Sequence, residues 1–280
     1  MDRRTTPANK RVAAKHLQGV VDAPSFVEGR DCKVGQPLVD LLRAPNGPRD
    51  RQLVLGQKLV VYEEIEGWAF VQSVADGYVG YVPSNAVVEQ AEESTHRVST
   101  IAGHAYTEPD IKSREAHALY FGSSVCITSH QPKFYETSDG HFIPKPHLRP
   151  IDKFFRDPVT VAQMFFGVPY LWGGNSAAGI DCSGLVQAGL LACGLECPGD
   201  SDMQANSVGE LTDAPTVRGD LLFWDGHVAI AVDETTLIHA NAHHMAVTYE
   251  PIDNAIRRIE AQGDGPVTAR RRLAVNPQAG

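Results

Sequence analysis

The chain has 280 residues, of which 42% are hydrophobic, enough for one large domain or two to three small domains with packed cores. Its net charge of −9 argues against nucleic acid as a partner. No apolar stretch matches a signal peptide or a membrane-spanning helix, and the five cysteines lack the spacing of a disulfide framework, which favours a reducing compartment. We therefore expect a globular protein of the cytoplasm, with no membrane and no nucleic-acid partner.

Residues 31–90 alternate short apolar runs with turns, a pattern typical of a small β-barrel. A weaker copy follows about 64 residues later, within residues 91–150. Three turn motifs recur there: Ala44-Pro45, Leu55-Gly56 and Asp76-Gly77-Tyr78 correspond to Glu108-Pro109, Phe121-Gly122 and Asp139-Gly140-His141. This order of a proline turn, a glycine turn, an aromatic strand and an Asp-Gly hairpin resembles the bacterial SH3 domain, which is found beside cell-wall enzymes. The sequence therefore predicts two SH3-like domains, 31–90 and 91–150, after an N-terminal extension of residues 1–30.

Residues 151–280 follow a proline-rich linker and have the pattern of an α+β domain. Helical spacing covers residues 159–166 and the segment from Cys182 to Gly194. Beyond Gly219, apolar runs indicate antiparallel strands at residues 220–224, 227–232, 236–240 and 245–249. Residues 262–280 fit either a closing strand or a tail.

Cys182 opens one of these helices, directly after a glycine-rich loop. A helix N-terminus stabilises an anion, and a cysteine is nucleophilic only as the thiolate. The alternative is a buried cysteine that only packs beneath the helix. The flanking Asp181, Ser183 and Gly184 favour the nucleophile, because an elbow of small residues lets a substrate approach closely.

A thiol nucleophile needs a base, and His227 and His239 lie in neighbouring predicted strands. A three-residue hairpin loop would set His239 opposite Ala229 and diagonal to His227, within about 7–8 Å. A two-residue loop would instead separate the two histidines. The small residues Ala229 and Ala231 on the same face would let the helix of Cys182 pack closely on it.

Four short motifs occur together within roughly residues 155–250: Asp-Cys-Ser, Gly-Asp-Leu-Leu-Phe-Trp, Gly-His-Val-Ala and Ile-His-Ala. Together they resemble the NlpC-type peptidase family, papain-like cysteine enzymes that hydrolyse peptides of the bacterial cell wall. The resemblance implies Cys182 as nucleophile, His227 as general base and then acid, and His239 as the residue that orients the imidazole. Tyr170 would stand beside the thiol to bind the oxyanion or order the site; its alternative role is an aromatic lid over the helix. The implied fold for residues 151–280 is a helix bearing the cysteine packed on an antiparallel sheet.

Asp200-Ser201 indicates a subgroup of this family. Much of the family has a basic residue before a small polar one, whereas this chain has a carboxylate, which suits a free amino terminus. The pattern resembles the γ-D-glutamyl-L-diamino acid endopeptidases, which act on freed cell-wall peptides that begin with L-alanine. In that subgroup the first SH3-like domain contributes a tyrosine to the substrate site. Tyr78 is the candidate here and Tyr81 the alternative. Tyr78 can equally be a core aromatic of the small barrel. The implied substrate contacts are Asp200, Ser201, Asp181, Ser183 and Tyr78, and the diamino acid is lysine or diaminopimelate.

Two other functions remain open. One is a metal site, because His239, His243 and His244 with Cys193 and Cys197 include metal-ligand types, although their spacing matches no closed zinc motif. The other is a non-catalytic module that binds cell-wall peptides and carries a degenerate peptidase domain. The intact set of one cysteine and two histidines argues against this module, and the peptidase interpretation requires no cofactor and no metal ion.

Overall fold

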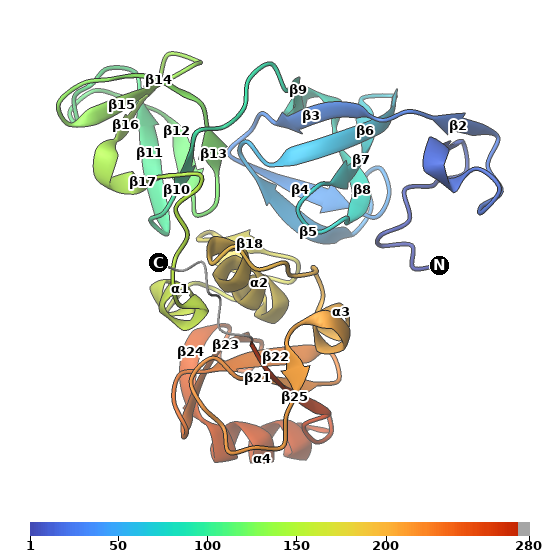
Figure 1. Ribbon diagram of the computed structural model, residues 1–280, viewed down its shortest axis with the longest axis vertical. Helices are drawn as coiled ribbons and strands as arrows, with labels where there is room; N and C mark the ends of the chain where they lie inside the picture. The colour runs from blue at the N-terminus through green and yellow to red at the C-terminus, as the bar shows by residue number, and fades with distance from the viewer. Residues whose placement is uncertain (274–280) are drawn as a thin grey trace. The chain divides into compact units, whose positions relative to one another are not determined.

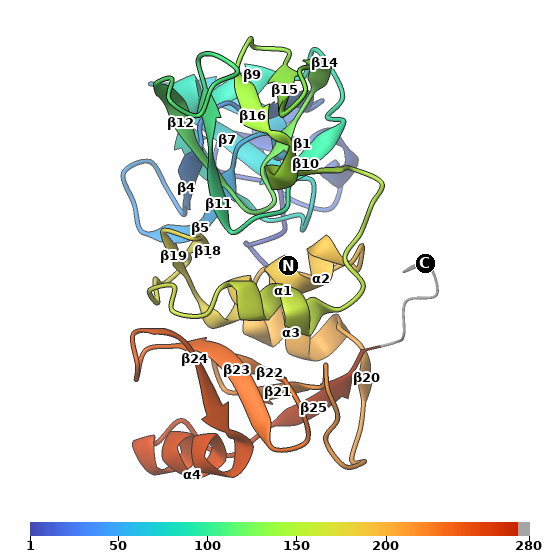
Figure 2. The same cartoon turned by 90° about the vertical axis from the view of Figure 1, so that its left-hand side faces the viewer.

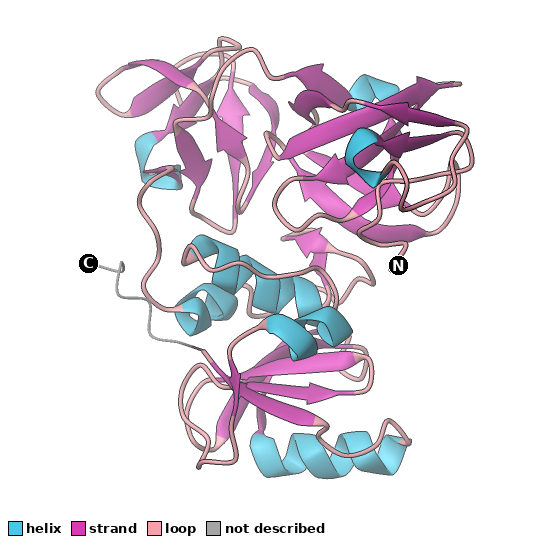
Figure 3. Cartoon of the chain, turned by 45° about the vertical axis from the view of Figure 1, so that its right-hand side comes forward, coloured by secondary structure: helices cyan, strands magenta, loops and turns pink. Residues whose placement is uncertain are grey.

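In the computed structural model, which describes residues 1–273, the chain divides into two units, Met1–Asp152 and Lys153–Gly280 (Figure 1). Strands dominate the first unit, whereas the second combines strands with the α-helices of the chain (Figure 3). Among the described residues, no helix has both the length and the apolar character needed to cross a membrane.

The largest sheet of the first unit has seven antiparallel strands in the order β5-β4-β8-β7-β6-β3-β9. Apolar residues alternate along these strands, so that Val39 and Leu41 of β4 point into the same core as Leu59 and Val61 of β6. A short parallel pair of strands precedes this sheet, β1 (Val12–Ala14) and β2 (Ser25–Val27). The sheet strands are β3 (Arg30–Val34), β4 (Leu38–Leu42), β5 (Arg49–Val54), β6 (Lys58–Ile65), β7 (Trp68–Ser73), β8 (Val79–Pro83) and β9 (Val87–Glu89).

Residues 91–150 form two further sheets around a core of their own. Five strands have the order β12-β11-β16-β15-β14, and three have the order β13-β10-β17. The buried side chains between them are Val98, Ala105, Leu119, Ile143 and Leu148. That this segment is a second SH3-like barrel stays a prediction. Its strands are β10 (His96–Val98), β11 (Ala102–Tyr106), β12 (Glu115–Tyr120), β13 (Ser124–Val125), β14 (Ile127–His130), β15 (Phe134–Thr137), β16 (Phe142–Pro144) and β17 (Leu148–Pro150).

The second unit is a six-stranded sheet with helices on both faces. Helices α1 (Pro158–Met164), α2 (Cys182–Ala192) and α3 (Ser201–Ser207) lie on one side and α4 (Ile252–Gln262) on the other (Figure 2). The strands have the order β20-β25-β21-β22-β23-β24, and the pairings within this sheet are antiparallel. They are β20 (Glu210–Leu211), β21 (Leu221–Trp224), β22 (His227–Ala231), β23 (Thr236–Asn241), β24 (Ala246–Pro251) and β25 (Ala269–Arg272); a separate hairpin joins β18 (Asn175–Ser176) to β19 (Gly179–Ile180).

The predicted helix at Cys182 and the antiparallel strands are confirmed, and part of residues 262–280 is indeed a strand, β25, which pairs with β20 and β21. Residues 274–280 of that segment lie outside the described residues. One packing expectation was wrong. Ala229 and Ala231 pack against α4 rather than against the helix of Cys182, in a buried cluster with Leu222, Leu237, Ile252, Ala255 and Ile259. The sheet is covered on both faces, and α2 contacts β22 and β23 from the other side.

Candidate active site

Cys182 is the first residue of α2, and Asp181 is the N-cap that ties the preceding loop to the helix. Oδ1 of Asp181 accepts hydrogen bonds from Gly184 N (2.7 Å) and Ser183 Oγ (3.0 Å), and Oδ2 accepts one from Gly173 N (2.9 Å). The cap fixes the cysteine on a rigid elbow. Both side chains, Asp181 and Ser183, form hydrogen bonds within the cap. Their contact with a substrate stays a prediction.

The thiol of Cys182 is almost completely buried, with 7% of the residue exposed. Burial, and after it the charge of Asp181, raises the pKa of the thiol to about 12. Hydrogen bonds from the backbone amides of Val228, Ser183 and Cys182 itself act in the opposite direction and favour the thiolate. The contact with Val228 also brings the sulfur to the residue that follows His227 in β22.

The hairpin between β22 and β23 has the register that the sequence predicts. Ala231 pairs with Leu237, and the same register sets His239 opposite Ala229. His227 and His239 therefore lie on one face of the sheet, and Nε2 of His227 is 2.9 Å from Nδ1 of His239. The two imidazoles are joined by a hydrogen bond.

A carboxylate that the sequence analysis did not single out extends this arrangement. Nε2 of His239 lies 3.2 Å from Oε2 of Glu250 in β24, and Glu250 accepts hydrogen bonds from Nε (3.0 Å) and Nη2 (2.7 Å) of Arg258 in α4. Burial alone would raise the pKa of Glu250, but the hydrogen bonds from His239 and Arg258 outweigh it and lower the pKa far below its usual value. Glu250 is therefore ionised and can only accept hydrogen bonds.

The ionised carboxylate fixes the position of the proton on both imidazoles. Because Glu250 only accepts, Nε2 of His239 carries a proton, and Nδ1 of neutral His239 is an acceptor. Nε2 of His227 must then donate to that nitrogen, which leaves the lone pair of neutral His227 on Nδ1. Burial lowers the pKa of both histidines and keeps them neutral near pH 7. The His227–His239–Glu250 row thus presents one unprotonated nitrogen, Nδ1 of His227, as a base.

Tyr170 lies near the thiol. Burial raises the pKa of Tyr170, and the charges of Cys182 and Asp181 raise it further, so the phenol stays protonated and can donate a hydrogen bond. Its backbone is held on two sides, by a bridge to Ile180 and by a hydrogen bond from its N–H to the carbonyl oxygen of Met245 (2.9 Å). This placement fits a role beside the thiol, and the role itself stays a prediction.

The predicted substrate pair lies at the start of α3, where Asp200 is the N-cap and Ser201 the first helical residue. Gln204, one turn later, donates hydrogen bonds from Nε2 to the carbonyl oxygens of Ser183 and Pro198, both at 3.0 Å. These bonds tie α3 to the start of α2. Asp200 and Ser201 are therefore held beside the helix that bears the cysteine, and their contacts with a substrate stay a prediction.

Tyr78 belongs to the first unit, where it is 2% exposed and part of the core of the larger sheet. The guanidinium carbon of Arg51 lies 5.6 Å from the centre of its ring. Tyr81, the alternative, is half-buried and packs against Phe70 with ring centres 5.1 Å apart. The surroundings of Tyr78 fit a core aromatic, and its contact with substrate stays a prediction.

The metal site expected as an alternative is not supported in the form that the sequence indicated. Among the described residues, His239 and His244 lie close to Glu250, but Cys193 and Cys197 join no group of metal-ligand side chains. The contact between His239 and Glu250 is accounted for by their hydrogen bond, and Arg258 supplies the positive charge that balances the carboxylate.

Glu250 and Arg258 are the site residues that the sequence analysis missed. The available signal was strand pairing: Leu237 pairs with Glu250, which places the carboxylate diagonal to His239 on the same face. To predict Glu250 from this signal, one would have had to know the pairing register between β23 and β24. Arg258 comes from α4, a helix that the sequence analysis did not predict.

Comparison with protein families identifies two segments of the chain. Residues 167–260 match the NlpC/P60 family, and residues 41–87 match the bacterial dipeptidyl-peptidase Sh3 domain. The second unit carries an NlpC/P60 domain. The matched range includes Cys182, His227, His239 and Glu250, so the row described above is part of that domain. The chain therefore combines an NlpC/P60 domain, which supports a hydrolase of the peptidase class, with an SH3 domain in its first unit.

Similar proteins match both units of the chain. It is 27% identical to dipeptidyl-peptidase 6 of Lysinibacillus sphaericus, over 72% of this chain and 83% of that protein. It is 23% identical to a γ-D-glutamyl-L-lysine dipeptidyl-peptidase of Bacillus cereus, over 73% of this chain and 71% of that protein. The fold resembles the crystal structure of an NlpC/P60 family protein from Bacillus cereus, with a TM-score of 0.74 at 20% identity over 87% of this chain and 99% of that structure.

Proposed function

We propose that the protein is a cysteine endopeptidase that cuts the γ-D-glutamyl-L-diamino acid bond of cell-wall peptides with a free N-terminal L-alanine. The observation that carries this proposal is the His227–His239–Glu250 row, which leaves Nδ1 of His227 unprotonated next to the strand residue that contacts the thiol of Cys182. The name of the Bacillus cereus relative supports the choice of bond. The diamino acid is lysine or diaminopimelate.

The first step is proton transfer from a neutral thiol. Burial raises the pKa of Cys182 to about 12 and lowers that of His227, so a preformed thiolate–imidazolium pair is disfavoured in the free enzyme. As the sulfur attacks the γ-carbonyl carbon of D-glutamate, the thiol proton passes to Nδ1 of His227, which acts as general base. His239 and, through it, the Glu250 carboxylate stabilise the resulting imidazolium.

The tetrahedral intermediate then collapses to a thioester. Its oxyanion accepts a hydrogen bond from the backbone amide of Cys182 and a second from Tyr170; one such donor contributes about 3–4 kcal/mol. His227 gives its proton to the amine of the departing diamino acid. Water attacks the thioester while His227 takes a proton, and that proton returns to the sulfur as the γ-carboxyl group of D-glutamate leaves.

Asp200 is proposed to bind the free amino group of the substrate. An N-acylated peptide carries no ammonium group there, so the charge-assisted hydrogen bond to the carboxylate would be lost. Ser201 and Tyr170 would line the same site. A preference for freed peptides suits an enzyme of peptidoglycan turnover or recycling in the cytoplasm, and the five free cysteines agree with a reducing compartment.

The test is cleavage of L-alanyl-γ-D-glutamyl-diaminopimelate and its N-acetylated form, followed by mass spectrometry. We expect cleavage of the free-amine peptide only, loss of cleavage in Cys182→Ala, and retained cleavage in Cys193→Ala, a second buried cysteine at the other end of α2. Equal cleavage of both peptides would contradict the proposed role of Asp200 in binding the free amine, while the proposed peptidase activity would stand. Binding without cleavage of either peptide by the unmutated protein would replace the enzyme by a binding module.

A further inference from the structure

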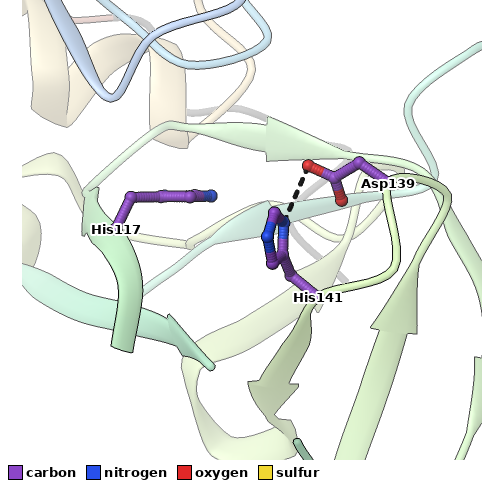
Figure 4. Close-up of side chains that lie close together, drawn as sticks. All are labelled: His117, Asp139 and His141. Atoms are coloured by element: carbon purple, nitrogen blue, oxygen red, sulfur yellow. Dashed lines mark ion pairs between the residues drawn. The ribbon is translucent and has the colours of Figure 1, made fainter. Parts of the chain in front are cut away.

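We propose that His117, Asp139 and His141 form a binding site for a divalent transition-metal ion such as Zn²⁺, made of residues outside the peptidase domain. His117 lies on β12, and Asp139 and His141 lie in the turn between β15 and β16 (Figure 4). Each residue offers one ligand atom, and these atoms lie within 4.8 Å of one another. Two imidazoles and one carboxylate are a ligand set that suits Zn²⁺ and the other late first-row metals.

His117 has the tautomer that metal binding requires. Its Nδ1 lies 3.0 Å from the carbonyl oxygen of Ala118, and because a carbonyl oxygen only accepts, Nδ1 must carry the proton. Nε2 therefore keeps its lone pair. A backbone carbonyl that holds one imidazole nitrogen while the other binds the ion is a common support for metal-binding histidines. Figure 4 shows the ring extended toward His141, and the two ring centres are 5.3 Å apart.

Asp139 and His141 are spaced like two ligands of one ion. Nδ1 of His141 lies 3.0 Å from Oδ2 of Asp139. That nitrogen is shielded from solvent and makes no hydrogen bond of good geometry, although it lies within ion-pair distance of the carboxylate. With metal–ligand bonds of about 2.1 Å, two ligand atoms about 3.0 Å apart subtend an angle of about 90° at the ion. Inward rotation of the His117 side chain would supply the third ligand.

The carboxylate is held in place and is open to an incoming ion. The hydroxyl of Thr137 hydrogen-bonds to Asp139, and the backbone N–H of His141 donates to the same hydroxyl at 3.0 Å. The side chain of Asp139 is 62% exposed and that of His141 30%, which leaves room for water to complete the coordination. A bound ion would cross-link β12 to the turn between β15 and β16.

Zinc binding to the EDTA-treated full chain, measured by equilibrium dialysis and by calorimetry, tests the site. We expect one equivalent of zinc to be lost in His117→Ala and in Asp139→Asn, and retained in His130→Ala, which changes an exposed histidine on β14 at the opposite edge of the same sheet. His117→Ala is the sharper variant, because it leaves the turn intact. Circular dichroism and melting of the metal-free variants would show that they fold.

Cobalt(II) separates this site from the thiol of the peptidase domain. Binding at His117, Asp139 and His141 is expected to give ligand-field absorption without a thiolate charge-transfer band, and the same spectrum in Cys182→Ala. Unchanged zinc stoichiometry in a folded His117→Ala protein would overturn the proposal. So would an equal loss in His130→Ala, or a cobalt spectrum that disappears with Cys182.

Discussion

Glu250→Gln is the substitution that tests the proton arrangement of the row most directly. Glutamine has nearly the same shape as glutamate, but it replaces one acceptor oxygen by a donor amide. The carboxylate accepts from His239 at 3.2 Å and from Arg258 at 3.0 and 2.7 Å, so glutamine cannot satisfy both partners. If its oxygen stays with Arg258, its amide donates to Nε2 of His239. His239 must then carry its proton on Nδ1, and His227 is forced to hold its own proton on the nitrogen that should act as base.

The size of the effect follows from these contacts. The replacement of a triad carboxylate by an amide in a serine protease lowers kcat by about 10⁴ through a wrong tautomer, and the loss of a supporting partner one step removed costs about 10–100-fold. Glu250 acts through His239, so we expect kcat to fall about 100-fold with little change in KM. Loss of the charge that pairs with Arg258 should also lower the free energy of unfolding by about 1.5–3 kcal/mol.

The assay is steady-state cleavage of the free-amine tripeptide, with denaturant unfolding on the same samples. Glu260→Gln is the matched control, because Glu260 lies on the exposed side of α4 and should leave both quantities unchanged. A folded Glu250→Gln protein with a kcat within threefold of the unmutated enzyme would refute the tautomer argument. A fall in stability without a fall in kcat would leave Glu250 as a purely structural residue.

Three further predictions concern charge. Arg258→Met removes the cation that lowers the pKa of Glu250, so the acidic limb of the kcat profile should move to higher pH; an unmoved limb would count against the row. Asp200→Asn should reduce kcat/KM for the free-amine peptide about 10–100-fold, as the loss of a charge-assisted hydrogen bond implies, and leave kcat/KM for the acetylated peptide unchanged. Asp202→Asn, on the exposed side of α3, is the control and should leave kcat/KM for both peptides unchanged. The two buried histidines have folded-state pKa values below their unfolded values. Below about pH 6.5 the free energy of unfolding should therefore decrease as the pH falls, by about 1.4 kcal/mol per pH unit for each histidine. His239→Gln should make this pH dependence of the free energy of unfolding shallower.

Local patterns made part of this site predictable. The helix at Cys182 follows from an acidic N-cap, a small-residue elbow and a regular apolar spacing, which are contained within about a dozen residues. The shared face of His227 and His239 follows from the length of one hairpin loop, because successive side chains on a strand alternate between faces. Each of these two signals is local in the sequence, so neither prediction required knowledge of a tertiary contact.

Which helix packs on each face of the sheet was harder to predict from the sequence. Ala229 and Ala231 indicated a close neighbour, and their small side chains cannot tell which helix that neighbour is. The apolar spacing of Ile252, Ala255 and Ile259 was present in the sequence, yet the helix α4 was not predicted. Without α4, the face was assigned to the helix of Cys182, and this produced the wrong packing expectation.

The same omission explains why Glu250 escaped notice. A glutamate near the end of a strand is usually exposed to solvent, because a buried carboxylate is costly unless a cation pairs with it. The cation is Arg258, and it comes from α4. Once α4 covers the face, Glu250 must be paired, a paired Glu250 must be ionised, and an ionised Glu250 can only accept from His239. The packing of one amphipathic helix on the far side of the sheet therefore decides which nitrogen of His227 keeps its lone pair and can serve as the proposed base.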